Sequence, residues 1–422
     1  MSRSNPFFYK TRRAVIGSSI LLEPLLTIYS LLAFIMRKDL HATAFQISVL
    51  MMLKPVVSIF SLYWSHAIND RRDKLLSNVF WAGVLGRAPF LFFPFVENIW
   101  LIIACAAFHM MMYRGAGPAW MEILKLNLPS EERGRIFSLG AVLGYIEGIV
   151  LAIGMGLLLD YDSRLWRWIF PASALLGIMG VFLQSQVPID LEKAPVVYRP
   201  RDKLGFLEGA SIWRKIAAPW KDSLNLMFRR PDFFRFQMGF MLCGFGIMLV
   251  QPVLPILFSD ILHLSYTEMM LSLSVCKGIG YALSSSIWAQ MINKINIYRV
   301  SSIIFLILGL YISLLICSTL HVSMIYAAYL CYGVVLAGNH LSWNLSGPIF
   351  AKEEDSSIFS SVNVVTVGLR GCVAPPLGGF LSVFMGPIAV LGIGFFLFLY
   401  SGIQMFFWGR SFIEKRSISD NL

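Results

Sequence analysis

The strongest constraint on this chain is a series of long apolar segments, each about 20 residues long, separated by short polar stretches. A hydrocarbon layer about 30 Å thick is crossed by about 20 residues of α-helix. Backbone amides in lipid must also bond within their own segment, which only a helix or a closed barrel allows. The pattern therefore predicts twelve transmembrane helices, which begin near Ala14, Phe45, Leu75, Ile99, Ile136, Leu165, Arg235, Thr267, Val300, Val322, Ile358 and Pro387.

Composition agrees with a surface that faces lipid. The chain is 57% hydrophobic and only 14% charged, whereas soluble domains contain about 25% charged residues. The six cysteines all fall inside predicted spans, in no paired or metal-type spacing, so we expect no disulfide framework and no metal site. The sequence contains no phosphate-binding glycine loop and no nucleophile triad. We therefore expect no enzyme activity and no cofactor.

The net charge of +11 indicates membrane topology and not nucleic-acid binding, because the basic residues lie mostly between the apolar segments. With the amino terminus inside, 26 of the 35 lysines and arginines face the cytoplasm and four face the other side. This asymmetry predicts a multi-pass protein of the cytoplasmic (inner) membrane with both termini in the cytoplasm.

One long polar stretch divides the predicted spans into six and six. The expected domains are residues 1–187, a cytoplasmic basic linker at 188–234, and residues 235–422. Within the linker, 205–228 has the pattern of an amphipathic helix on the inner membrane surface. An unstructured tether is the alternative.

The two halves of the sequence also repeat one another. Four matches occur at offsets of 222 to 224 residues, and an even number of spans separates the copies. Parallel repeats of this kind predict an axis along the membrane normal and a substrate site between the halves. The matched features are Trp64 and Trp288, Lys54 and Lys277, Trp120 and Trp343, and the motifs at 131–138 and 353–360.

The loop after the second span resembles the signature G-x-x-x-D-R/K-x-G-R/K of the major facilitator superfamily. Asp70, Arg71 and Lys74 match it, while His66 and Asp73 replace its glycines. Arg114 with its following glycines is similar to the fourth-span motif, and 371–379 to the glycine-proline motifs. The resemblance implies an all-α fold of two six-helix bundles related by pseudo-twofold symmetry. It also implies transport by alternating access, with Asp70, Arg71 and Lys74 at a gate.

Seven ionised side chains lie in the middle of predicted spans, where a charge needs a partner or a water-filled cavity. Several begin polar stripes at helical spacing. We expect a cavity lined by Lys277, Arg370, Lys54, Arg114, Tyr281, Asn363 and Thr366. The alternative is a set of buried ion pairs that fix helix packing. Arg87 is interpreted as structural.

The favoured function is a secondary transporter that moves a small anionic or zwitterionic solute. Glu23 is the first candidate for proton coupling, since an acidic residue in the first span has that role in some proton-coupled exporters of the resembled family. Glu147 is the second candidate. The expected partners are the solute, the bilayer and H⁺, with the protein a monomer. Two alternatives stay open: a proton-driven multidrug efflux pump, and a receptor or scaffold without transport.

Overall fold

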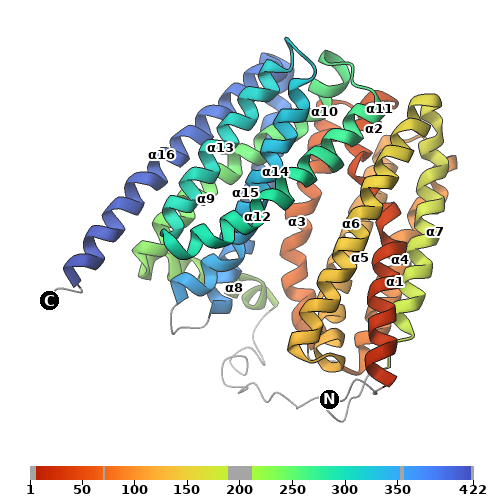
Figure 1. The fold of residues 1–422 in the computed structure, drawn as a ribbon, viewed down its shortest axis with the longest axis horizontal. Helices are drawn as coiled ribbons and strands as arrows, with labels where there is room; N and C mark the ends of the chain where they lie inside the picture. The colour runs from red at the N-terminus through yellow and green to blue at the C-terminus, as the bar shows by residue number, and fades with distance from the viewer. Residues whose placement is uncertain (1–5, 70–71, 189–211, 352–355, 420–422) are drawn as a thin grey trace. The chain divides into compact units, whose positions relative to one another are not determined.

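The structure, a computed structural model, describes residues 6–69, 72–188, 212–351 and 356–419. Within these ranges the chain forms helices and short connections, with no strand. This confirms the prediction of an all-α membrane fold (Figure 1).

The first half of the chain consists mostly of long α-helices joined by short connections. The helices are α1 (Pro6–Ser30), α2 (Leu32–Lys38), α3 (Ala44–Asn69), η1 (Arg72–Lys74), α4 (Leu75–Arg87), η2 (Ala88–Phe95), α5 (Ile99–Asn127), α6 (Ser130–Tyr161), η3 (Ser163–Leu165) and α7 (Trp166–Ser185). Helices α1 and α2 together form the first predicted span, and α4 with η2 forms the third.

The second half begins with α8 and includes two π-helical segments, η7 and η8. Its helices are α8 (Ile212–Arg229), α9 (Pro231–Val250), η6 (Gln251–Val253), α10 (Leu254–Ile256), η7 (Leu257–Ile261), α11 (Tyr266–Met270), η8 (Leu271–Cys276), α12 (Lys277–Lys294), α13 (Ile297–Cys317), α14 (Met324–Ala351), α15 (Ser356–Met385) and α16 (Pro387–Ser419). Helix α8 covers the second part of the stretch predicted to be an amphipathic helix and extends one residue beyond it, while the first residues of that stretch lie outside the described ranges.

Ten helices in the described ranges are long and apolar enough to cross a membrane. The two remaining predicted spans are α3, whose apolar part among the described side chains is Ala44–Phe60, and the helix from α11 to α12. Each of these two helices contains a lysine, Lys54 in α3 and Lys277 at the start of α12. The total of twelve spans stays a prediction.

The chain divides into two compact units. Unit 1 comprises residues 1–197 together with His263–Ser274, and unit 2 comprises residues 198–262 and 275–422. The segment His263–Ser274 comes from the second half of the sequence, yet it packs in unit 1, where α11 contacts α6.

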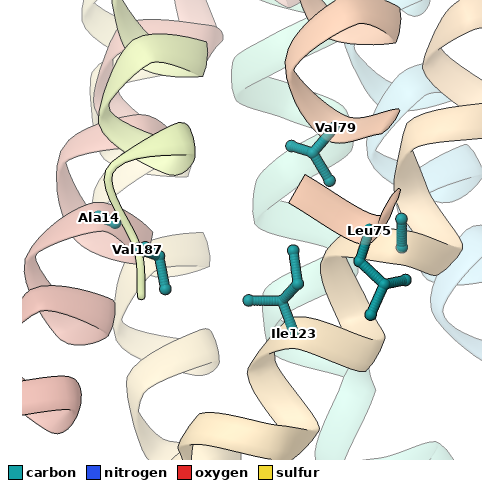
Figure 2. Packing of buried hydrophobic residues seen from close by; sticks show 6 residues of the cluster. Ala14, Leu75, Val79, Ile123 and Val187 are labelled. Carbon is teal, nitrogen blue, oxygen red and sulfur yellow. The ribbon is translucent and has the colours of Figure 1, made fainter. Parts of the chain in front are cut away.

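Apolar side chains hold the helices of unit 1 together near one end of α4. Ala14 of α1, Leu75 and Val79 of α4, and Ile123 of α5 are buried in one cluster with Val187, which follows α7 (Figure 2). The partly buried Trp120 packs against this cluster. Close packing of this kind fixes the rotation of each helix, and therefore decides which polar side chains meet.

Candidate functional site

Two acidic side chains of unit 1 lie together, although 124 residues separate them in the sequence. Glu23 is on α1 and Glu147 is on α6, and these two helices pack against each other. A Cβ atom at Gly148 would lie only 2.7 Å from a carboxylate oxygen of Glu23. The glycine therefore leaves the space in which the Glu23 carboxylate lies, directly beside Glu147.

The two carboxylates are close enough to act on each other electrostatically. One carboxylate oxygen of Glu147 is also buried with no hydrogen-bond partner among the described residues. Like charges repel, so two neighbouring carboxylates favour a proton or a cation at one of them. The sequence presented Glu23 and Glu147 as separate candidates, and the structure places them on two packed helices within electrostatic reach of each other.

A pair of cations forms a second feature of unit 1. Lys54 lies in the middle of α3 with an exposed side chain, and the half-buried Arg114 on α5 is near enough to repel it. Two neighbouring cations create a positive potential that attracts an anionic group. The structure thus places two of the predicted cavity residues together.

A hydrogen-bonded tryptophan positions α3 against α5 near these cations. The indole nitrogen of Trp64 donates to Asn78 Oδ1 at 3.0 Å. Asn78 in turn donates to the backbone oxygen of Gly115 at 2.9 Å, one residue after Arg114. A Cβ atom at Gly115 would lie 2.5 Å from the Trp64 ring, so this glycine allows the indole to pack directly on α5.

In unit 2, Lys277 begins α12 and is half-buried. One turn later, the Tyr281 ring packs edge-on to the ring of His340 on α14, with 5.9 Å between centroids. The predicted pair Lys277 and Tyr281 therefore lies on one face of α12, and its tyrosine faces α14.

Arg370 lies deep inside unit 2, with 8% of its surface exposed. Its Nη1 donates to the backbone oxygen of Phe240 on α9 at 2.8 Å. A Cβ atom at Gly244 would overlap the guanidinium group. Among the described residues, Nε has no hydrogen-bond partner and no carboxylate forms an ion pair with this arginine.

Asn363 and Thr366, the other predicted cavity residues of α15, are also buried within unit 2. Asn363 accepts a hydrogen bond from Gln237 on α9 and donates to Ser346 on α14 at 3.0 Å. Thr366 donates to the backbone oxygen of Asn363 at 2.9 Å. These contacts join the three helices α9, α14 and α15 inside unit 2.

The predicted gate motif is only partly described. Asp70 and Arg71 lie outside the described residues. Lys74 is exposed at the end of η1, immediately before α4 begins.

Sequence reasoning missed a carboxylate that binds the first turn of another helix. Asp160, near the end of α6, accepts hydrogen bonds from the backbone nitrogens of Tyr266 at 2.6 Å and Thr267 at 2.9 Å. Asp160 and Asp162 both follow the fifth apolar segment, so nothing in the sequence distinguishes the one that makes this contact.

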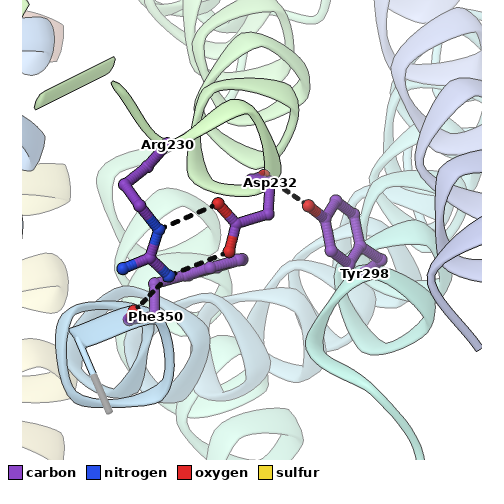
Figure 3. Close-up of polar contacts among 4 residues, drawn as sticks. All are labelled: Arg230, Asp232, Tyr298 and Phe350. Carbon is purple, nitrogen blue, oxygen red and sulfur yellow. Dashed lines mark hydrogen bonds and ion pairs between the residues drawn. The ribbon is translucent and has the colours of Figure 1, made fainter. Parts of the chain in front are cut away.

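A second missed feature is a clamp at the start of α9 (Figure 3). Arg230 donates to both carboxylate oxygens of Asp232, at 3.2 and 3.0 Å, and to the backbone oxygen of Phe350 at 2.9 Å. The Tyr298 hydroxyl donates to the backbone oxygen of Asp232. The clamp joins the start of α9 to α13 and to the end of α14.

The sequence matches the family model described as Major Facilitator Superfamily over residues 18–375. This range covers most of the chain. The chain belongs to the major facilitator superfamily. Among curated proteins, none matches this superfamily member in sequence at a significant level.

Solved structures of other transporters share its fold. A mutant of the nucleoside transporter NupG gives a TM-score of 0.71 at 13% identity, covering 95% of this chain and 99% of that one. A bacterial homologue of the human lysosomal transporter Spinster gives 0.69 at 13% identity, with 97% and 98% covered. The xylose transporter XylE from E. coli gives 0.62 at 13% identity, with 95% of each chain covered.

Membership of the superfamily makes the protein a multi-pass membrane transporter of small molecules and not an enzyme. In the described part of the chain, no three His, Cys, Asp or Glu side chains gather in a way that could hold a metal ion.

Proposed function

We propose that this transporter couples the movement of protons to that of a small anionic or zwitterionic solute by alternating access. The observation that supports this proposal best is the Glu23–Glu147 pair, with the carboxylate of Glu23 beside Gly148. A carboxylate pair that gains and loses a proton changes its charge by one unit. The conformational equilibrium can follow that change if the two states bind the proton with different affinity.

The anionic nature of the solute is supported by the cations. Lys54 and Arg114 lie close together in unit 1, and Arg370 lies buried in unit 2 with no carboxylate partner in the described ranges. Arginine binds carboxylate and phosphate groups in a bidentate manner. Lys277 is proposed to assist, with Tyr281 beside it, while Asn363 and Thr366 hold α15 in place.

The proposed transporter is organised as two halves that move relative to each other. Two six-helix bundles, residues 1–187 and 235–422, would exchange between two states, joined by a cytoplasmic linker at 188–234. Asp70, Arg71 and Lys74 would support the gate on the cytoplasmic side. The protein would act as a monomer in the cytoplasmic membrane with both termini inside.

Solute uptake into reconstituted vesicles tests the proposal. Candidate solutes are carboxylates, phosphate esters, amino acids and small peptides, with nucleosides and xylose included because structurally similar proteins transport them. We expect accumulation of an anionic or zwitterionic solute that rises several-fold when a proton gradient is imposed. Uptake of neutral sugars alone, unaffected by the gradient, would contradict it.

The competing proposal of multidrug efflux makes a different prediction in the same vesicles. Lipophilic cations should then be exported and should compete with one another, because an efflux cavity accepts apolar surface without a fixed anion site. The neighbouring cations Lys54 and Arg114 favour the anionic solute, since they would repel a cationic drug.

A further inference from the structure

We propose that Asp160 is a gating residue. In one state its carboxylate holds the start of α11 on α6, and in the next state of the cycle it releases α11. The inference rests on the proposed alternating-access function, because a gate has meaning only in a protein that exchanges between states. It concerns the segment His263–Ser274, which packs in unit 1 although it comes from the second half of the sequence.

The contact is made by one charged group and two backbone amides. Asp160 accepts from the nitrogens of Tyr266 and Thr267, at 2.6 and 2.9 Å, which are the first two residues of α11. Amides in the first turn of a helix have no partner within the helix. A carboxylate there also interacts favourably with the helix dipole.

The backbone of α6 is shaped for this contact. Gly156 lies four residues before Asp160, on the same face of α6. A Cβ atom at Gly156 would lie 2.9 Å from the Cα atom of Thr267. Glycine therefore lets the two backbones approach until the Asp160 carboxylate reaches the amides.

A second charged side chain binds the same segment. Lys38, at the end of α2, donates from Nζ to the backbone oxygen of Leu264 at 2.6 Å. The ammonium group also lies 4.6 Å from the centroid of the Tyr266 ring, a cation–π contact. Two helices of unit 1 thus hold one short segment through charged side chains.

The position of the segment connects the contact to the proposed solute site. From α11 the chain continues as helix through the π-helical segment η8 into α12, which begins with Lys277. The boundary between the two units falls between Ser274 and Val275, inside η8. Because π-helical segments have weakened regular bonding, η8 is a place where α11 can move independently of α12.

The contact is also easily reversed. Asp160 is exposed and Thr267 is half-buried, while Tyr266 is buried against Phe34, so water can replace both hydrogen bonds once the Tyr266 ring has left its position. Release also exposes the buried side chains of Leu264 and Tyr266, so the hydrogen bonds are the part of this contact that water can replace without loss. The polar contact therefore suits a gate that opens and closes repeatedly.

Hydrogen–deuterium exchange on the full-length protein tests the contact directly. Asp160→Asn should raise exchange in a peptide covering Leu264–Met270 about 10-fold or more, because a charged acceptor is replaced by a neutral one. Asp162→Asn is the matched control, since Asp162 accepts from the nitrogen of Arg164, at 2.9 Å and two residues along, and from no other helix in the described part of the chain. Asp160→Glu, which keeps the carboxylate, should restore part of the protection.

A readout of conformation separates a gate from a scaffold. Spin labels at Trp168 and Leu320, both strongly exposed, should report two distance populations in a background without the native cysteines. Asp160→Asn should shift the ratio of these populations several-fold at an unchanged thermal midpoint. A lowered midpoint with an unshifted ratio would show a scaffold, and unchanged exchange would show no functional contact. If Asp160→Asn raises exchange and changes the population ratio but vesicles accumulate no anionic solute, Asp160 is a gating residue and the solute proposal is wrong.

Discussion

In each unit, a charged side chain lies over a glycine of a neighbouring helix, at positions that nearly correspond in the two repeats. The helix that carries the charge in one unit corresponds to the helix that carries the glycine in the other. In unit 1, Glu23 of α1 lies against Gly148 of α6, and in unit 2, Arg370 of α15 lies over Gly244 of α9. At the repeat offset of 222 residues, Gly148 corresponds to Arg370 and Gly244 to Leu22, which precedes Glu23. The first and fifth spans of each repeat therefore approach closely at one charge. The sign of that charge and the helix that supplies it differ.

A tryptophan–glycine contact shows the opposite behaviour, because it is the same in both units. Trp64 packs on Gly115 and Trp288 packs on Gly338, and both members of the pair repeat at about the same offset. Arg114, beside Gly115, is replaced by Ala337 in the second repeat. The comparison teaches that duplication kept the contacts that pack the helices, while the charges that distinguish the repeats diverged.

The largest effect should come from filling the glycine beside Arg370. Gly244→Leu places a side chain where the guanidinium lies, so we expect most of the folded protein to be lost in size-exclusion chromatography. Gly392→Leu is the control, because a Cβ atom there meets no other atom within 4 Å. Adding Arg370→Ala to Gly244→Leu should recover part of the folded protein. Equal amounts of folded protein for Gly244→Leu and Gly392→Leu would contradict a close contact between Arg370 and Gly244.

The next effect concerns the acidic counterpart in unit 1. Glu23→Gln and Glu147→Gln should each reduce gradient-driven accumulation about 10-fold or more, because removal of either carboxylate ends the coupling of the pair. Solute counterflow, which needs no net proton movement, should continue in both variants. A full proton response in Glu23→Gln with none in Glu147→Gln would assign coupling to Glu147 alone.

A moderate effect is expected at the cation of unit 2. Arg370→Lys keeps the charge but loses the planar fork, so solute affinity should fall about 5- to 20-fold if Arg370 binds the anionic group. Lys277→Ala should weaken binding by a similar factor. The measurement is equilibrium binding of the solute identified in vesicles. Parent-like affinity in both variants would show that these residues serve packing.

The smallest effect tests the contact that repeats. Trp64→Phe and Trp288→Phe each remove one indole hydrogen bond, to Asn78 and to the backbone of Val334. Each should lower the free energy of unfolding by about 1 kcal/mol. The Trp64 change should cost slightly more, since it leaves the Asn78 oxygen without its donor. Thermal unfolding of the two variants side by side gives the difference, and a loss confined to Trp288→Phe would contradict the expected similarity.

The sequence predicted the class of fold and the family because both depend on patterns along the chain. Apolar segments of the right length, separated by polar loops, predict membrane helices, and the structure confirms an all-α fold with ten helices able to span. The motifs around Asp70 and Arg114 indicated the superfamily, which the family model confirms. Seven charged residues in the middle of predicted spans supplied the candidate residues for solute binding and proton coupling.

Only the tertiary structure decided which of those charges meet. Glu23 and Glu147 come together because Gly148 leaves space for a carboxylate between two packed helices. The buried polar groups of α15 face α9 and α14 inside their own unit, which the helical period alone cannot show. Asp160 holds two backbone amides of α11, and backbone donors have no signature in a sequence. Periodicity defines the residues on one face of a helix, but the rotation of that face follows from packing against its neighbours.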